Sequence, residues 1–190
     1  MRYLIVCGGK IDKEFGLNEI KTDGIDAIIA ADSGMDFLYE NGVTPDIIVG
    51  DFDSTTTNAL EYFERKGQTE IRRLNPIKDD TDTEYAIRLA ISEGARSIVL
   101  LGATGSRIDH VLGNISLLGI GLESGTDISI IDTNNRIRMA DKPVTIEKSA
   151  QYGRFVSLIA LTDDNEVSLK GFKYPCLLYT SPSPRDRSVS

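Results

Sequence analysis

The sequence predicts an α/β protein in which a parallel sheet covered by helices is followed by a smaller antiparallel β domain. From the start of the chain to about Ile131, apolar runs of strand length alternate with helical patterns, which is typical of parallel sheets with covering helices. The strand runs are largely apolar and rich in β-branched residues, as in strands covered on both faces. After Asp132 the runs become short, turn residues separate them, and no strong helical pattern appears.

The first strand is predicted at the run from Tyr3 to Cys7, which is too short for the apolar region of a signal peptide. A later helix is expected to begin near Asp82, because Thr81 and Glu84 fit a capping box. In chain order, we predict strands near residues 3–7, 26–31, 46–50, 69–74, 97–101 and 127–131, and helices near residues 33–41, 56–66, 82–93 and 108–122.

The second part of the chain holds four short apolar runs, at residues 136–139, 144–146, 155–161 and 166–169. We therefore predict an α/β domain over residues 1–131 and an incomplete antiparallel β domain over residues 132–175. The last segment, residues 176–190, is rich in Ser, Pro and Arg, a composition typical of loops and disorder. It also resembles sequencing-adapter read-through joined to a truncated gene, so we predict a disordered tail that is not native to the fold.

Composition excludes several classes of function. The 190-residue chain carries a formal charge of −8 and shows no basic patch, which argues against nucleic acid or an acidic membrane as a main partner. The two cysteines, Cys7 and Cys176, do not suggest a disulfide framework, so a reduced, cytoplasmic protein is the simpler account. No apolar run approaches the length of a transmembrane helix.

The stretch PDIIVGDFDS at residues 45–54 ends a buried strand on two carboxylates, Asp51 and Asp53. In an extended backbone these side chains lie on one side, with Cα atoms roughly 6.6 Å apart, which allows both to hold one divalent cation. Ligands of open α/β sheets bind outside the carboxyl ends of the strands. The alternative is that Asp53 or Ser54 merely caps the helix that follows.

A second acidic cluster, KDDTDTE at residues 78–84, stands at the foot of the helix expected from Asp82. Acidic residues in a first helical turn are favoured by the helix dipole. Capping explains one or two of these carboxylates, but it does not require three of them beside Lys78.

A third segment, GATGSRIDH at residues 102–110, lies between a strand and a helix. The N–H groups of such a turn and of a helix N-terminus form a phosphate cradle, to which Arg107 would add a bidentate fork. Ser106 and Asp109 also fit a simple capping pair. Together the three segments predict a magnesium–polyphosphate site, because Mg²⁺ prefers one or two carboxylates with phosphate oxygens and water.

These motifs, in order with ADSG at residues 31–34 and the full run GATGSRIDHVLGN, resemble the thiamine pyrophosphokinase family over residues 1 to about 175. The resemblance implies a homodimer with a Rossmann-like α/β domain and a C-terminal β-sandwich, so the domain at residues 132–175 is expected to contribute to thiamine binding and to the dimer contact. It also implies Mg²⁺-dependent transfer of the diphosphate of ATP to the hydroxyl of thiamine, with release of AMP.

The resemblance also implies roles for individual residues. Ser33 stands where the family commonly has a second glycine, which is a mild departure that leaves the role of Gly34 intact. Asp82 and Asp109 are the candidates for accepting the hydroxyl proton. The implied site comprises Asp51, Asp53 and Asp82 for the metal, Lys78 and Arg107 for phosphates, Asp79 and Asp109 for thiamine, and Gly8, Gly9, Asp32 and Gly34 for the nucleotide.

Three alternatives stay open at this point. DFDS superficially resembles the DxD motif of haloacid-dehalogenase-type phosphatases, in which Asp51 would be a nucleophile, although those enzymes carry it after their first strand and here it follows the third. A module that binds nucleotide or thiamine without turnover would need the same carboxylates. A purely structural account makes all the acidic residues helix caps.

Overall fold

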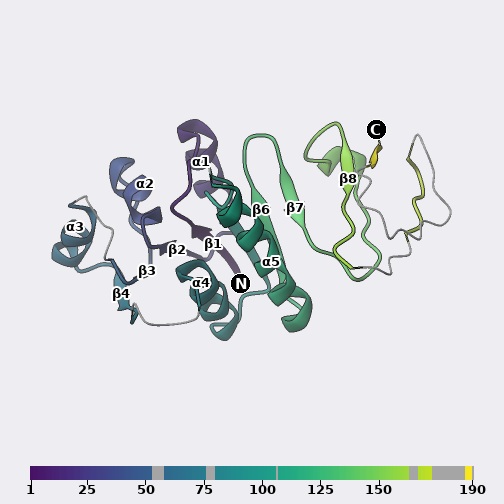
Figure 1. Ribbon diagram of the computed structural model, residues 1–190. Coiled ribbons are helices and arrows are strands. Elements are labelled where there is room, and N and C mark those ends of the chain that lie inside the picture. The colour runs from purple at the N-terminus through teal and green to yellow at the C-terminus, as the bar shows by residue number, and fades with distance from the viewer. Residues whose placement is uncertain (53–57, 76–79, 106, 163–166, 173–186, 190) are drawn as a thin grey trace. The chain divides into compact units, whose positions relative to one another are not determined.

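A computed structural model describes residues 1–52, 58–75, 80–105, 107–162, 167–172 and 187–189 (Figure 1). The predicted Asp53, Lys78 and Asp79 lie outside the described residues. The chain forms two compact units, Met1–Val144 and Thr145–Ser190, and each is described by itself.

The first unit is built on a seven-stranded sheet with the order β4-β3-β2-β1-β5-β6-β7, which confirms the α/β prediction. The first six strands are parallel, and β7 runs antiparallel to β6. The strands are β1 (Arg2–Val6), β2 (Ala27–Ala31), β3 (Ile47–Gly50), β4 (Glu70–Arg73), β5 (Ser97–Leu101), β6 (Asp127–Ile131) and β7 (Arg136–Arg138). The helices are α1 (Lys13–Ile20), α2 (Gly34–Glu40), α3 (Ala59–Lys66), α4 (Asp82–Ser92) and α5 (Ile108–Ser124).

Helices cover the sheet on both faces, and strand alternation assigns successive side chains to one face or the other. In β1, Ile5 joins the core formed with α4 and α5, whereas Leu4 and Val6 join the core formed with α2 and α3. The same alternation places Val49 of β3 on the α4 side and Ile48 on the opposite side. The burial of both faces explains why these strands are apolar throughout.

Helix α1 is the one described α-helix that the sequence analysis missed. Its sequence, KEFGLNEI, is polar and contains a glycine, and glycine disfavours helix interiors. The Asp12 side chain caps the helix by accepting a hydrogen bond from the Phe15 N–H at 2.9 Å. Gly16 has a packing reason, because a Cβ there would lie 2.7 Å from Cζ of Phe37. Tertiary packing therefore outweighs the weak local signal.

The region after Ile131 differs from its prediction in two respects. Strand β7 extends the main sheet, so the first unit continues to Val144, beyond the boundary drawn after residue 131. The run at residues 144–146 forms no strand. The described part of the second unit contains a short 3₁₀ helix at Lys148–Ala150 and the strand β8 (Val156–Leu158), which pairs antiparallel with β9 (Arg187–Val189). Strand β9 lies within the segment for which the sequence predicted disorder.

Among the described helices, none has both the length and the apolar character needed to cross a membrane.

Candidate active site

The loops that follow the parallel strands meet at the carboxyl edge of the sheet. Strand β1 lies between β2 and β5, so the chain leaves β1 toward one side of the sheet and later returns to the other. Ligands of open α/β sheets bind at such a reversal of strand order. Asp32 follows β2, Asp51 follows β3, and the N-terminus of α4 presents Asp82 at the same place.

The carboxylates of Asp32, Asp51 and Asp82 form a cluster that we call the carboxylate trio. One oxygen from each residue lies within 4.8 Å of those of the other two, and all three residues are half-buried. Oδ1 of Asp32 is buried and has no hydrogen-bond partner among the described residues. Three carboxylate oxygens at this spacing, one of them without a hydrogen bond, fit the ligand preferences of a hard divalent cation such as Mg²⁺. The sequence placed Asp51 and Asp82 together, but the resemblance assigned Asp32 to the nucleotide.

The electrostatics of the trio are unfavourable without a cation. Burial raises the pKa of Asp32, and repulsion from Asp82, Asp51 and Asp36 raises it further, while a hydrogen bond from the Ser33 N–H opposes the shift. Asp32 also has a left-handed backbone with φ of 49°, a conformation that aspartate tolerates better than most residues. A bound cation would relieve the repulsion.

At the start of α4, different residues cap the helix and form the carboxylate trio. The hydroxyl of Thr81 accepts a hydrogen bond from the Glu84 N–H at 3.2 Å, as predicted. The Glu84 carboxylate pairs with Arg88 at 2.7 Å. Thr81 therefore supplies the cap, and the position of Asp82 beside Asp32 and Asp51 is not needed for capping.

The glycines predicted for nucleotide binding lie at the same edge, where backbone packs against backbone. A Cβ at Gly34 would lie 1.9 Å from the carbonyl oxygen of Val6, and one at Gly9 would lie 2.2 Å from that of Gly102. The Gly9 N–H donates a hydrogen bond to the same Gly102 oxygen at 2.9 Å. A Cβ at Gly8 would lie 2.0 Å from Oγ of Ser33. Close backbone packing alone thus requires Gly9 and Gly34, whereas at Gly8 the close neighbour is the Ser33 side chain.

Arg107 and Asp109, at the start of α5, form an ion pair. The Arg107 guanidinium donates two hydrogen bonds to the Asp109 carboxylate, at 3.2 and 2.6 Å, and both side chains are exposed, by 67% and 63%. The Arg107 guanidinium lowers the pKa of Asp109. The Arg107 guanidinium at the start of α5 therefore pairs with Asp109, and its role as a phosphate fork stays a prediction.

Two residues that sequence reasoning missed hold the loop between β5 and α5. The Asn114 side chain donates a hydrogen bond to the Ala103 carbonyl at 2.8 Å. Asp132 accepts hydrogen bonds from the Asn134 and Asn135 N–H groups at 2.7 Å, and a hydrogen bond with Thr104 helps to lower its pKa. Asn114 ends the motif GATGSRIDHVLGN, so its place in that motif was a usable signal.

Cys7, at the same edge, is a packed thiol. Burial raises its pKa to about 11, and the Thr83 hydroxyl donates a weak hydrogen bond to its sulfur at 3.7 Å. A thiol with such a pKa is not a nucleophile at neutral pH.

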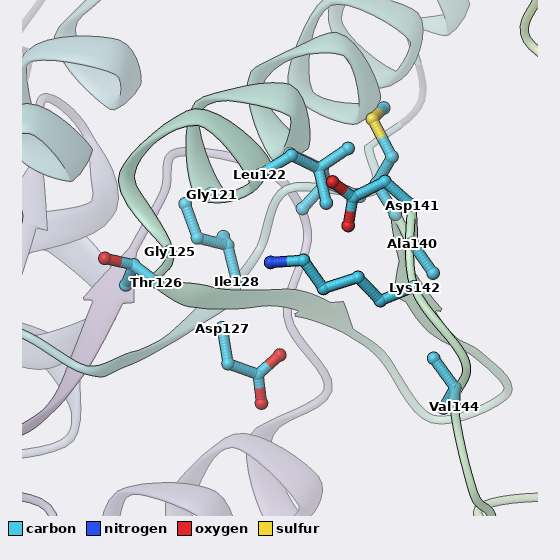
Figure 2. A pocket seen from close by; sticks show the side chains of 12 residues that line it. Gly121, Leu122, Gly125, Thr126, Asp127, Ile128, Ala140, Asp141, Lys142 and Val144 are labelled. Atoms are coloured by element: carbon cyan, nitrogen blue, oxygen red, sulfur yellow. The ribbon is translucent and has the colours of Figure 1, made fainter.

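A cavity of about 190 Å³ lies elsewhere, between the end of α5 and the start of β6 (Figure 2). Figure 2 shows the Lys142 side chain extending toward Gly121 and Ile128 there. The cavity is smaller than the usual ligand pocket of roughly 300 Å³ or more. It lies at the amino edge of the parallel strands, opposite the trio.

Comparison with known proteins decides the family. The family model described as "Thiamin pyrophosphokinase, catalytic domain" matches residues 21–130. The chain is 36% identical to the thiamine pyrophosphokinase of Bacillus subtilis over 149 residues, which are 77% of this chain and 69% of that protein. The chain belongs to the thiamine pyrophosphokinase family.

Solved structures agree with this assignment. The crystal structure of thiamine pyrophosphokinase from Bacillus subtilis matches with a TM-score of 0.78 and 28% identity, covering all of this chain and 93% of that one. The one from Geobacillus thermodenitrificans matches with a TM-score of 0.81 and 27% identity, covering all of this chain and 87% of that one. As a thiamine pyrophosphokinase family member, the chain is an enzyme of the transferase class. This decides against the phosphatase, binding-module and purely structural alternatives.

Proposed function

We propose that the chain transfers the diphosphate of ATP to the hydroxyl of thiamine in a Mg²⁺-dependent reaction, giving thiamine diphosphate and AMP. The observation that carries this proposal is the carboxylate trio of Asp32, Asp51 and Asp82 at the carboxyl edge of the sheet. The trio lies where open α/β sheets bind their ligands, within a chain of the thiamine pyrophosphokinase family. Asp53 joins the proposed metal ligands on the sequence pattern alone.

The proposed reaction is an in-line substitution at the β-phosphorus of ATP. The thiamine hydroxyl oxygen forms a bond to this phosphorus, the bond to the oxygen shared with the α-phosphate breaks, and AMP leaves with that electron pair. When bound, Mg²⁺ would supply positive charge at the phosphate oxygens. The protein contributes mainly positioning and electrostatic stabilisation, as in other phosphoryl transfers.

The loops at the edge supply the proposed phosphate contacts. The N-terminus of α5 suits an anion in principle, although the His110 N–H already donates a hydrogen bond to Asp109. Asn114 holds the preceding loop in place through Ala103. Arg107 would have to exchange Asp109 for a phosphate, which exposure of both side chains allows. Lys78 is proposed from the sequence pattern.

The hydroxyl proton needs an acceptor, and two aspartates were predicted for this role. The lowered pKa of Asp109 makes it a weaker base than an ordinary aspartate. Arg107 would release Asp109 on binding a phosphate, so Asp82 and Asp109 both stay our proposed acceptors. Asp79 and Asp109 remain our proposed thiamine contacts.

We also propose that the enzyme is a cytoplasmic homodimer. Helix α5 exposes Ile108 by 74% and Leu112 by 59%, one turn apart beside the proposed site. The second unit, which lies in the part of the chain expected to form the dimer contact, also exposes Phe155, Ile159 and Leu161. A sedimentation measurement that found only monomer at high concentration would count against the dimer.

The experiment that tests the proposed site compares Asp51→Asn and Asp82→Asn with Asp127→Asn. Asp127 is an aspartate at the opposite edge, paired with Arg138 at 2.5 Å. We expect the first two variants to lose nearly all turnover at saturating Mg²⁺ while keeping their circular dichroism spectra. The control should keep near-normal turnover. Near-normal activity in both trio variants would refute the metal assignment.

A further inference from the structure

We infer that Phe52 is a positioning residue that holds Asp51 in the carboxylate trio. The inference rests on the proposed metal site. Phe52 has φ of 61°, and it shares positive φ only with Asp32 among the described non-glycine residues. Aspartate tolerates the left-handed region, but a bulky aromatic residue does so rarely. The conformation of Phe52 therefore has to be maintained by its surroundings.

Packing around the Phe52 ring holds the backbone in this conformation. Phe52 is only 9% exposed and belongs to the core cluster that includes Met35, Ala59 and Phe63, on the face covered by α2 and α3. Burying a whole aromatic ring is among the largest stabilising contributions that a single side chain makes. Relaxing the backbone at Phe52 would pull this ring out of the core.

The ring is also enclosed at the end of the sheet. A Cβ at Gly50 would lie 3.0 Å from Cε1 of Phe52 and 3.3 Å from Cα of Asp32. The Arg73 guanidinium lies 5.4 Å from the centre of the ring and is itself paired with Glu64 at 2.6 Å. A side chain at position 50 would therefore crowd both the ring and Asp32, and these neighbours would have to shift by a few tenths of an ångström.

The position of Phe52 in the chain links this anchor to the trio. Val49 lies in the core on the α4 side, and Asp51, two residues later, meets Asp82 at the start of α4. Phe52, the next residue, is buried in the core on the opposite face. The ring thus anchors the peptide that carries Asp51, and a looser anchor lets that carboxylate leave the trio.

A comparison of Phe52→Leu with Phe52→Ile distinguishes a role in positioning Asp51 from a role in filling the core. The two side chains have equal composition and similar volume, but a β-branched side chain resists the left-handed region much more strongly. Phe63→Leu is the matched control, because Phe63 is fully buried in the same cluster and lies within α3. Phe52→Gly removes the anchor while permitting any φ.

The test measures Mn²⁺ affinity by electron paramagnetic resonance, together with thermal unfolding of each variant. We expect Phe52→Gly to raise the Kd for Mn²⁺ at least fivefold and Phe52→Ile at least threefold. Phe52→Leu should stay within twofold of the unaltered protein. Phe63→Leu should unfold at lower temperature with an unchanged Kd.

Equal Kd values for Phe52→Ile, Phe52→Leu and the unaltered protein would overturn the inference while leaving the metal site intact. If Phe52→Gly does not fold, the Kd values of Phe52→Ile and Phe52→Leu for Mn²⁺ still test whether Phe52 positions Asp51. If neither the unaltered protein nor Phe63→Leu binds Mn²⁺ at millimolar concentration, the proposed metal site is wrong. The inference about Phe52 is then wrong as well.

Discussion

Replacing Asp32 by asparagine should stabilise the metal-free protein and abolish most of its stabilisation by Mg²⁺. Asparagine keeps the shape of the side chain, retains an oxygen that can accept the Ser33 N–H, and tolerates the left-handed backbone at this position. The substitution therefore removes one negative charge from the trio with little other change.

The size of the effect follows from the geometry. Oxygens of Asp32, Asp51 and Asp82 lie within 4.8 Å of one another. At that distance two unit charges repel by about 0.9 kcal/mol in a water-like dielectric, which suits these half-exposed groups. Removing the Asp32 charge eliminates two such pairs, or roughly 1–2 kcal/mol. For a protein of this size, that corresponds to a rise in Tm of about 2–8 °C.

The assay is thermal unfolding in EDTA and in a Mg²⁺ series. Mg²⁺ stabilises the folded state in proportion to the logarithm of its concentration above Kd, so the unaltered protein should overtake Asp32→Asn as Mg²⁺ increases. Asp127→Asn, at the opposite edge, should show the same Mg²⁺ response as the unaltered protein.

The pH dependence has a defined sign. Because the pKa of Asp32 is raised in the folded state, the folded protein binds this proton more tightly, and stability from this group decreases as pH rises through the folded pKa. The advantage of Asp32→Asn in EDTA should therefore be full at pH values above the folded pKa of Asp32. It should shrink as pH falls below that pKa toward the ordinary aspartate range. A less stable Asp32→Asn protein in EDTA, or an unchanged Mg²⁺ response, would refute this reasoning.

Two further predictions concern the helix starts at the site. Arg107→Lys should lower kcat/KM for ATP by tenfold or more without changing Tm, because an ammonium group cannot reproduce a planar fork. Unchanged kinetics would show that Arg107 does not contact the phosphates. Thr81→Ala should destabilise the protein by about 1 kcal/mol through loss of the α4 cap, whereas Thr81→Ser should restore most of that stability; equal denaturant midpoints for the three proteins would show that the cap contributes nothing.

The parallel sheet could be predicted from the sequence because its strands are buried on both faces and therefore appear as continuous apolar runs. Helix α1 could not, since its residues Lys13–Ile20 carry little apolar periodicity and Gly16 is explained only by its packing against Ile11 and Phe37. Strand β7 was predicted as a strand, but its partner β6 could not be identified, because pairing depends on the path of the chain in space.

The candidate site was predictable to a similar degree. Asp51 and Asp82 stood out because each is at a strand end or helix start. The proximity of Asp32 depends on the adjacency of β2 and β3 and on its left-handed backbone, neither of which is visible in the motif ADSG. The pairing of Arg107 with Asp109 is a local side-chain choice that the helix pattern does not specify. The roles proposed for these residues remain predictions.

The most direct test of the central claim is product analysis of the purified chain with ATP and Mg²⁺, with and without thiamine. Diphosphate transfer predicts AMP and thiamine diphosphate in equal amounts, formed only when thiamine is present and absent in Asp51→Asn. Formation of ADP with thiamine monophosphate, or release of AMP that does not depend on thiamine, would contradict the proposed reaction.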